Sequence, residues 1–73
     1  GEIARRITEL MENDKLYQEP ELTLQHLADK LQQQPYLVSQ AINDGMKKSF
    51  YDLVNGYRVE EAKRLLLHPG NRN

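Results

Sequence analysis

The chain has 73 residues, of which 38% are hydrophobic, ten are basic and eleven are acidic, and its net charge is −1. A chain of this length buries only about 60% of the surface that it exposes when unfolded. It therefore has room for one small domain, which excludes a two-domain enzyme and a doubly wound nucleotide-binding domain. The chain has no cysteine, which excludes disulfides and thiolate metal sites. No apolar run approaches the roughly 20 residues of a membrane-spanning helix.

Apolar residues three or four positions apart predict helices along the chain, and no stretch alternates apolar and polar residues like a half-buried strand. Ile3, Ile7 and Leu10 define one face of a first helix, expected over residues 3–13. A connector of residues 16–21 follows, because Pro20 disfavours helix at the residue before it.

The next two helices are short. A second helix of about eight residues begins after Thr23, whose hydroxyl is suited to cap a helix N-terminus. Residues 32–34 are three glutamines that form a polar hinge, and Pro35 favours the start of a third helix. Gly45 fits the left-handed position that ends a helix. Residues 23–44 are therefore predicted to form a helix-turn-helix.

The longest predicted helix covers residues 49–67, and a polar tail of residues 68–73 follows. Ser49 and Asp52 form a capping box in which Asp replaces the usual Glu. The predicted inner stripe consists of Phe50, Leu53, Val54, Tyr57, Ala62, Leu65 and Leu66. Gly56 has two open interpretations, an exposed and tolerated glycine or a close approach of another backbone. Together these elements predict an all-α, homeodomain-like domain of four helices.

Enzymatic chemistry has little support in the residues. His26 and His68 lie far apart with no ligand spacing around either, and His26 falls on the face opposite the apolar residues of its helix. The adjacent Glu60 and Glu61 point in different directions on a helix and cannot flank a substrate. Glu60 is instead placed to pair with Arg64, four residues later. We predict no catalytic residue, no metal site and no cofactor.

Binding of double-stranded DNA has better support. In a helix-turn-helix the second helix lies in the major groove, and its N-terminal residues contact base edges. Here that helix is residues 35–43, and its polar face carries Tyr36, Ser39, Gln40 and Asn43. Gln and Asn can pair with adenine, and Ser can contact a base or a phosphate. An ordinary amphipathic surface helix also has a polar face, so the pattern alone leaves both interpretations open.

The distribution of charge favours DNA binding modestly. Residues 1–36 carry four basic and seven acidic side chains, a net charge of −3, whereas residues 37–73 carry six and four, a net charge of +2. Lys47 and Lys48 precede the helix that Ser49 caps, so two ammonium groups adjoin a helix N-terminus and suit a phosphate. Because so few phosphates would be neutralised, we expect weak binding.

The last helix has two further features. Arg58 lies on its apolar stripe, where the guanidinium would bond helix-end carbonyls or an acid such as Glu61, or else contact a phosphate. We favour the first, structural interpretation. Leu65, Leu66 and Leu67 near the helix end predict a surface for self-association.

Two segments resemble the DNA-binding unit of AraC/XylS-type transcription regulators. The segment LQHLADKL at 24–31, followed by YLVSQAIN at 36–43, resembles the first helix-turn-helix of that family. The segment KSFYDLVNGYRVEEAKRLL at 48–66 resembles its linker helix. The resemblance covers about residues 5–69, nearly the whole chain.

The resemblance implies a bacterial, cytoplasmic regulator whose two helix-turn-helix subdomains are joined by a long helix. This chain would hold the first subdomain and that helix, as a fragment of a larger protein. Tyr36, Ser39 and Gln40 match base-facing positions, whereas Asn43 and Lys47 would lie near the DNA backbone. The glutamine hinge departs from the usual small or Gly-containing turn. Gln40 stands where the family often has Arg, which favours adenine over guanine.

An alternative function is a helical module that binds another protein. The same fold would then use Tyr36, Leu37 and Tyr51 as exposed anchors, and the low net charge favours this interpretation. Salt dependence separates the two functions, because only binding through phosphates weakens steeply as salt rises.

Overall fold

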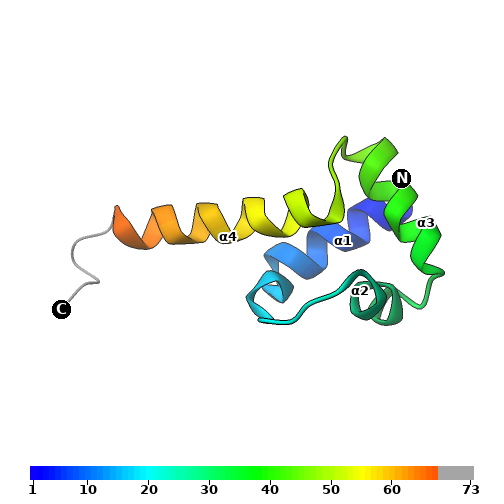
Figure 1. Ribbon diagram of the computed structural model, residues 1–73, viewed down its shortest axis with the longest axis horizontal. Helices are drawn as coiled ribbons and strands as arrows, with labels where there is room; N and C mark the ends of the chain where they lie inside the picture. Colours follow the sequence, from blue (N-terminus) through cyan, green and yellow to red (C-terminus); the bar gives the residue numbers. More distant parts are fainter. Residues whose placement is uncertain (68–73) are drawn as a thin grey trace.

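The computed structural model describes residues 1–67, and all regular secondary structure in these residues is helical, with no strand (Figure 1). The all-α prediction is therefore confirmed for this part of the chain. The four α-helices are α1 (Glu2–Glu12), α2 (Leu24–Leu31), α3 (Pro35–Gln40) and α4 (Phe50–Leu66). A 3₁₀ turn, η1 (Leu16–Gln18), follows α1, and a π-helical turn, η2 (Ala41–Gly45), continues α3. The predicted tail, with His68, lies outside the described residues.

Side-chain caps begin α2 and α4, as the sequence predicts. Thr23 Oγ1 accepts a hydrogen bond from the N–H of His26 at 3.1 Å, and Ser49 Oγ accepts one from the N–H of Asp52 at 3.0 Å. Each hydroxyl satisfies a backbone donor that has no carbonyl partner in the first turn of its helix. α3 begins without such a bond, because the side chain of Gln34 makes none.

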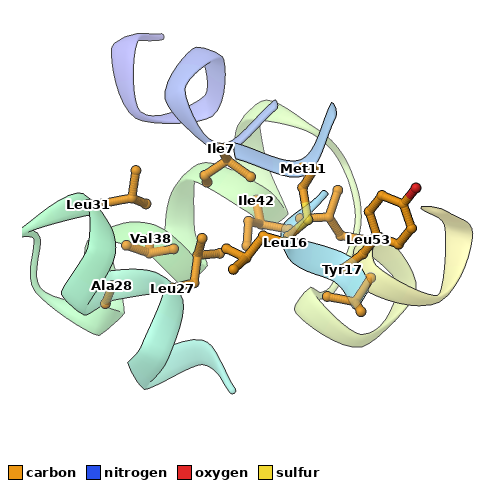
Figure 2. Close-up of a cluster of buried hydrophobic side chains, with 11 residues drawn as sticks. Ile7, Met11, Leu16, Tyr17, Leu27, Ala28, Leu31, Val38, Ile42 and Leu53 are labelled. Carbon is orange, nitrogen blue, oxygen red and sulfur yellow. The ribbon is translucent and has the colours of Figure 1, made fainter. Parts of the chain in front are cut away.

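One hydrophobic core holds the helices together (Figure 2). It lies where α1, α2, α3 and the first half of α4 meet. The face predicted for the first helix is confirmed, because Ile7 is in the core and Ile3 and Leu10 pack against it. Its fully buried side chains of largest volume are Ile7, Met11, Leu27, Leu31, Val38, Ile42 and Leu53.

The connector after α1 is part of this core, which the sequence analysis did not predict. Leu16 and Tyr17 in η1 are both buried. The ring of Tyr17 stacks on that of Tyr57 in α4, with ring centroids 5.5 Å apart and 13° between the planes. Two adjacent large apolar residues in the connector were the available signal. η1 thus joins the end of α1 to α4.

The end of the third helix differs from the prediction. Helical geometry continues through η2, and the left-handed position falls on Lys47, with φ 61°, whereas no glycine among residues 1–67 has a positive φ. The N–H of Lys48 then bonds the carbonyl of Ile42 at 3.2 Å. η2 packs against α1, where a Cβ built on Gly45 would make only an ordinary van der Waals contact with that of Ala4, at 3.8 Å, so the helical geometry at position 45 does not require glycine.

α4 packs on the core only along its first half. Leu53 and Val54 are buried, but Ala62, Leu65 and Leu66 are exposed. Figure 1 shows the second half of α4 projecting beyond the other helices. The predicted inner stripe is therefore wrong for its last three residues. A helical period shows which residues share a face, but it does not show whether a neighbour covers that face.

The structure distinguishes between the interpretations of Gly56 and Arg58. A Cβ on Gly56 would meet no atom within 4 Å, which favours an exposed and tolerated glycine. Arg58 Nε donates to the carbonyl of Tyr17 at 2.9 Å, and Nη2 donates to the carbonyl of Glu19 at 2.7 Å. The structural interpretation of Arg58 is thus confirmed, with carbonyls at the end of η1 as the acceptors.

The ion pairs of α4 join residues three positions apart. Arg64 donates to Glu61 at 2.8 Å and Lys63 to Glu60 at 3.5 Å, so the predicted pair of Glu60 with Arg64 is wrong. The hydrogen bond from Arg64 is the main cause that lowers the pKa of Glu61. These pairs are accessible to water and contribute little to stability.

Candidate nucleic-acid interface

The six residues predicted to contact DNA lie on α3, on η2 and on the turn that leads into α4. Ser39 is partly buried, and the other five are exposed: Tyr36, Gln40, Asn43, Lys47 and Lys48. The opposite side of α3 and η2 carries Val38 and Ile42, which have no exposed surface. Burial of that side leaves the polar side accessible to a ligand.

The polar side chains of this surface form two groups. Tyr36, Ser39 and Asn43 follow one another at steps of three and four residues, and Asn43 Nδ2 donates a weak hydrogen bond to Ser39 Oγ at 3.4 Å. Gln40 instead borders a hollow of about 420 Å³ between α3 and the N-terminal end of α1, together with Asp44. The structure therefore brings Ser39 and Asn43 together and places Gln40 at the edge of the surface.

The turn between η2 and α4 carries the two lysines. Lys47 has a left-handed backbone, and the N–H of Lys48 closes the turn onto η2. Ser49 caps α4 immediately afterwards. Because the N-terminus of a helix carries a partial positive charge, this turn combines two ammonium groups with a helix end that favours an anion.

Acidic groups reduce the positive potential of this turn. Asp44 and Asp52 flank Lys47 and Lys48 in the chain, and all four side chains are exposed. The formal charge of the four residues is zero. Glu2 adds a carboxylate beside the hollow that Gln40 borders. The attraction for a phosphate backbone is therefore weak, because these carboxylates offset the charge of the two lysines.

A second hollow, of about 500 Å³, lies between the ends of α1 and η1 and the second half of α4. Tyr57 donates a hydrogen bond to Glu12 at 3.1 Å there, and Tyr17 donates a long one to Glu61 at 3.5 Å. Burial, followed by the contact with Glu12, raises the pKa of Tyr57. His26 is exposed on α2, and no group of side chains among residues 1–67 could hold a metal ion.

None of the helices formed by residues 1–67 has the length and apolar character needed to cross a membrane. No protein-family model, no curated protein and no solved structure matches the chain.

Proposed function

We propose that the chain binds double-stranded DNA through α3 and η2, as part of a transcription regulator that resembles the AraC/XylS type. The observation that carries the proposal is the division of this segment into two sides. Val38 and Ile42 are fully buried, whereas a polar side that carries Tyr36, Ser39 and Asn43 faces solvent. α2 and α3 pack against each other and are joined by residues 32–34 alone, as a helix-turn-helix requires.

In this mode α3 enters the major groove and its polar side chains contact base edges. The amides of Gln40 and Asn43 each offer a donor and an acceptor, which match N6 and N7 of adenine. Ser39 accepts a hydrogen bond from Asn43 and so helps to orient that amide. Tyr36 reaches a thymine methyl group or a phosphate. The function is recognition, without a chemical step.

Lys47 and Lys48 contact phosphates beside the N-terminus of α4 in this proposal. Two neutralised phosphates give a slope of about −2 in a plot of log affinity against log salt concentration. We therefore expect the affinity to fall about tenfold when the salt concentration rises fourfold.

The test is an amide-spectrum titration of the chain with a short mixed-sequence duplex at low salt. We expect shifts at Tyr36, Ser39, Gln40, Asn43, Lys47 and Lys48 that disappear as salt is added. Replacing Lys48 with Gln should reduce the salt slope by about 1. The matched control is Lys15→Gln, at the η1 end of the domain, which should leave the slope unchanged. Shifts confined to other elements, or salt-independent binding, would contradict the proposal.

A second candidate function is binding of another protein through the same surface. Tyr36 and Tyr51 are 68% and 72% exposed, which is unusual for large aromatic side chains without a ligand. Leu37 borders the hollow beside α1, together with Ile3 and Ala4. The net charge of −1 also suits a protein partner. Binding to a protein through these anchors would respond little to salt, so the same titration separates the two functions.

A further inference from the structure

α4 carries a second apolar stripe that faces away from the core. Tyr51, Asn55, Val59, Ala62 and Leu66 follow one another at steps of three or four residues, so they share one face of the helix. All of them except Asn55 are exposed, and Asn55 is partly exposed. We call these five residues the outer stripe. The core residues of α4 lie on a different side, which explains why apolar residues occur around much of its circumference.

The outer stripe is distinct from the general exposure of the helix end. Leu66 and Leu67 have nearly the same exposure, 73% and 74%. Leu67, however, lines the hollow with Tyr57 and Arg64 and so lies on another side of α4. Leu66 therefore belongs to the stripe and Leu67 does not, although the two side chains are chemically identical neighbours.

We propose that the outer stripe pairs with the same stripe on a second copy of the chain, with the two α4 helices antiparallel. In that register Tyr51 lies opposite Leu66 of the second copy and Asn55 lies opposite Ala62 of the second copy. The centre of the pair falls near Val59. The interface then extends along the full length of the outer stripe, and α4, with 17 residues, is about 25 Å long.

Charges beside the stripe specify the antiparallel direction. Asp52 and Lys63 are eleven positions apart, about three helical turns, so they border the stripe on the same side. In a parallel pair the two-fold axis runs along the helices, so Asp52 and Lys63 of one copy lie on the opposite side of the interface from those of the other copy and form no contacts with them. An antiparallel pair places Asp52 of each copy near Lys63 of the other, which forms two opposite-charge contacts across the interface.

The size of the stripe sets the expected affinity. One narrow strip on each of two helices lies at or below the low end of the about 1,200–2,000 Å² that specific interfaces bury. We therefore expect a weak, reversible dimer that forms at about 0.1 mM, and a largely monomeric chain at low micromolar concentration. The dimer uses none of the six residues assigned to DNA, so its failure would not contradict the proposed function, and failure of the proposed function would not contradict the dimer.

The first test is sedimentation equilibrium of the 73-residue chain over a range of concentrations. We expect a monomer–dimer equilibrium that Leu66→Asp weakens at least tenfold and that Leu67→Asp leaves unchanged. Both positions are exposed, so both variants should fold, and circular dichroism checks this. A monomer at every concentration would overturn the proposal. Equal weakening by the two variants would also overturn it, because association would then involve the whole end of α4 and not the outer stripe alone.

The second test addresses the direction of pairing. Asp52→Lys and Lys63→Asp should each weaken the dimer, and the double variant should restore it, because opposite charges again face each other. If the double variant is weaker than either single variant, the antiparallel pair is wrong.

Discussion

Among residues 1–67, three residues other than glycine have a left-handed backbone. They are Lys15, Gln32 and Lys47, with φ of 54°, 57° and 61°. This conformation costs an L-residue roughly 1–2 kcal/mol. Gln32 occupies the position where a helix end commonly has glycine, since its N–H bonds the carbonyl of Asp29 and the next N–H bonds that of Ala28. The backbone at position 32 is therefore strained by the presence of a side chain, and glycine at this position would relieve that strain.

Gln32→Gly should raise the free energy of unfolding by about 0.5–1 kcal/mol, because relief of the strain exceeds the added flexibility of the unfolded chain. Urea unfolding followed by circular dichroism measures this change. The matched control is Gln33→Gly, at a position with a negative φ, which should lower stability. A loss of stability in the Gln32 variant would indicate that its side chain makes contacts worth more than the strain.

Tyr57 gives a prediction at alkaline pH. Burial and the hydrogen bond to Glu12 raise its pKa above the ordinary value of 10. The folded state therefore holds the phenol proton more tightly than the unfolded state does. The protonated phenol therefore adds to the free energy of unfolding. This contribution is fully present below the pKa of Tyr57 in the unfolded chain, and it is lost as the pH rises through the pKa of Tyr57 in the folded chain. Ultraviolet titration should show a tyrosine ionisation above the ordinary pKa, and Tyr57→Phe should remove that late step.

Between elements, the contact of α4 with η1 combines the stacked rings of Tyr17 and Tyr57 with hydrogen bonds from the guanidinium of Arg58. Arg58 donates to two carbonyls of the segment around η1, those of Tyr17 and Glu19. Arg58→Ala removes both bonds and should lower the free energy of unfolding by about 2 kcal/mol. Arg64→Ala is the control, and its effect should be much smaller because its ion pair with Glu61 is accessible to water. Equal effects in thermal unfolding would contradict this role of Arg58.

Elements that depend on local signals could be predicted from the sequence. Thr23 and Ser49 begin helices because each hydroxyl bonds a donor only three residues away. The end of α3 could not be predicted in this way, because η2 continues the helix where it contacts α1, and that contact joins segments that are distant in the chain. The outward side of α4 was mistaken for a core face for a related reason, since periodicity does not show what lies beside a helix.

The candidate site was predictable to the same extent. Periodicity placed Tyr36 and Asn43 on the surface, and both are exposed in the structure. It did not show that Gln40 borders a hollow with Asp44, because that neighbourhood depends on where α1 lies. Contact with DNA stays a prediction.

For the whole molecule, stability depends on a core with little reserve. A single domain below about 70–80 residues rarely gains more than about 3–5 kcal/mol from its core. Leu27 is fully buried, and Leu→Ala at such a site costs about 2–5 kcal/mol. Leu27→Ala should therefore leave much of the chain unfolded at 25 °C, as a loss of helical circular dichroism. The exposed Val59→Ala should keep the native spectrum, and a native spectrum for the Leu27 variant would show a larger reserve.

The open space beside Gly56 has a consequence for the melting temperature. A methyl group there would meet no atom within 4 Å, so alanine fits α4 without rearrangement. Alanine in place of glycine favours a helix by about 1 kcal/mol. For a domain of this size that gain corresponds to about 4–8 °C in Tm, which calorimetry of Gly56→Ala measures. The fold is therefore compatible with a higher melting temperature than the natural sequence gives it, because glycine at position 56 lowers helix stability at a site where a methyl group would have room.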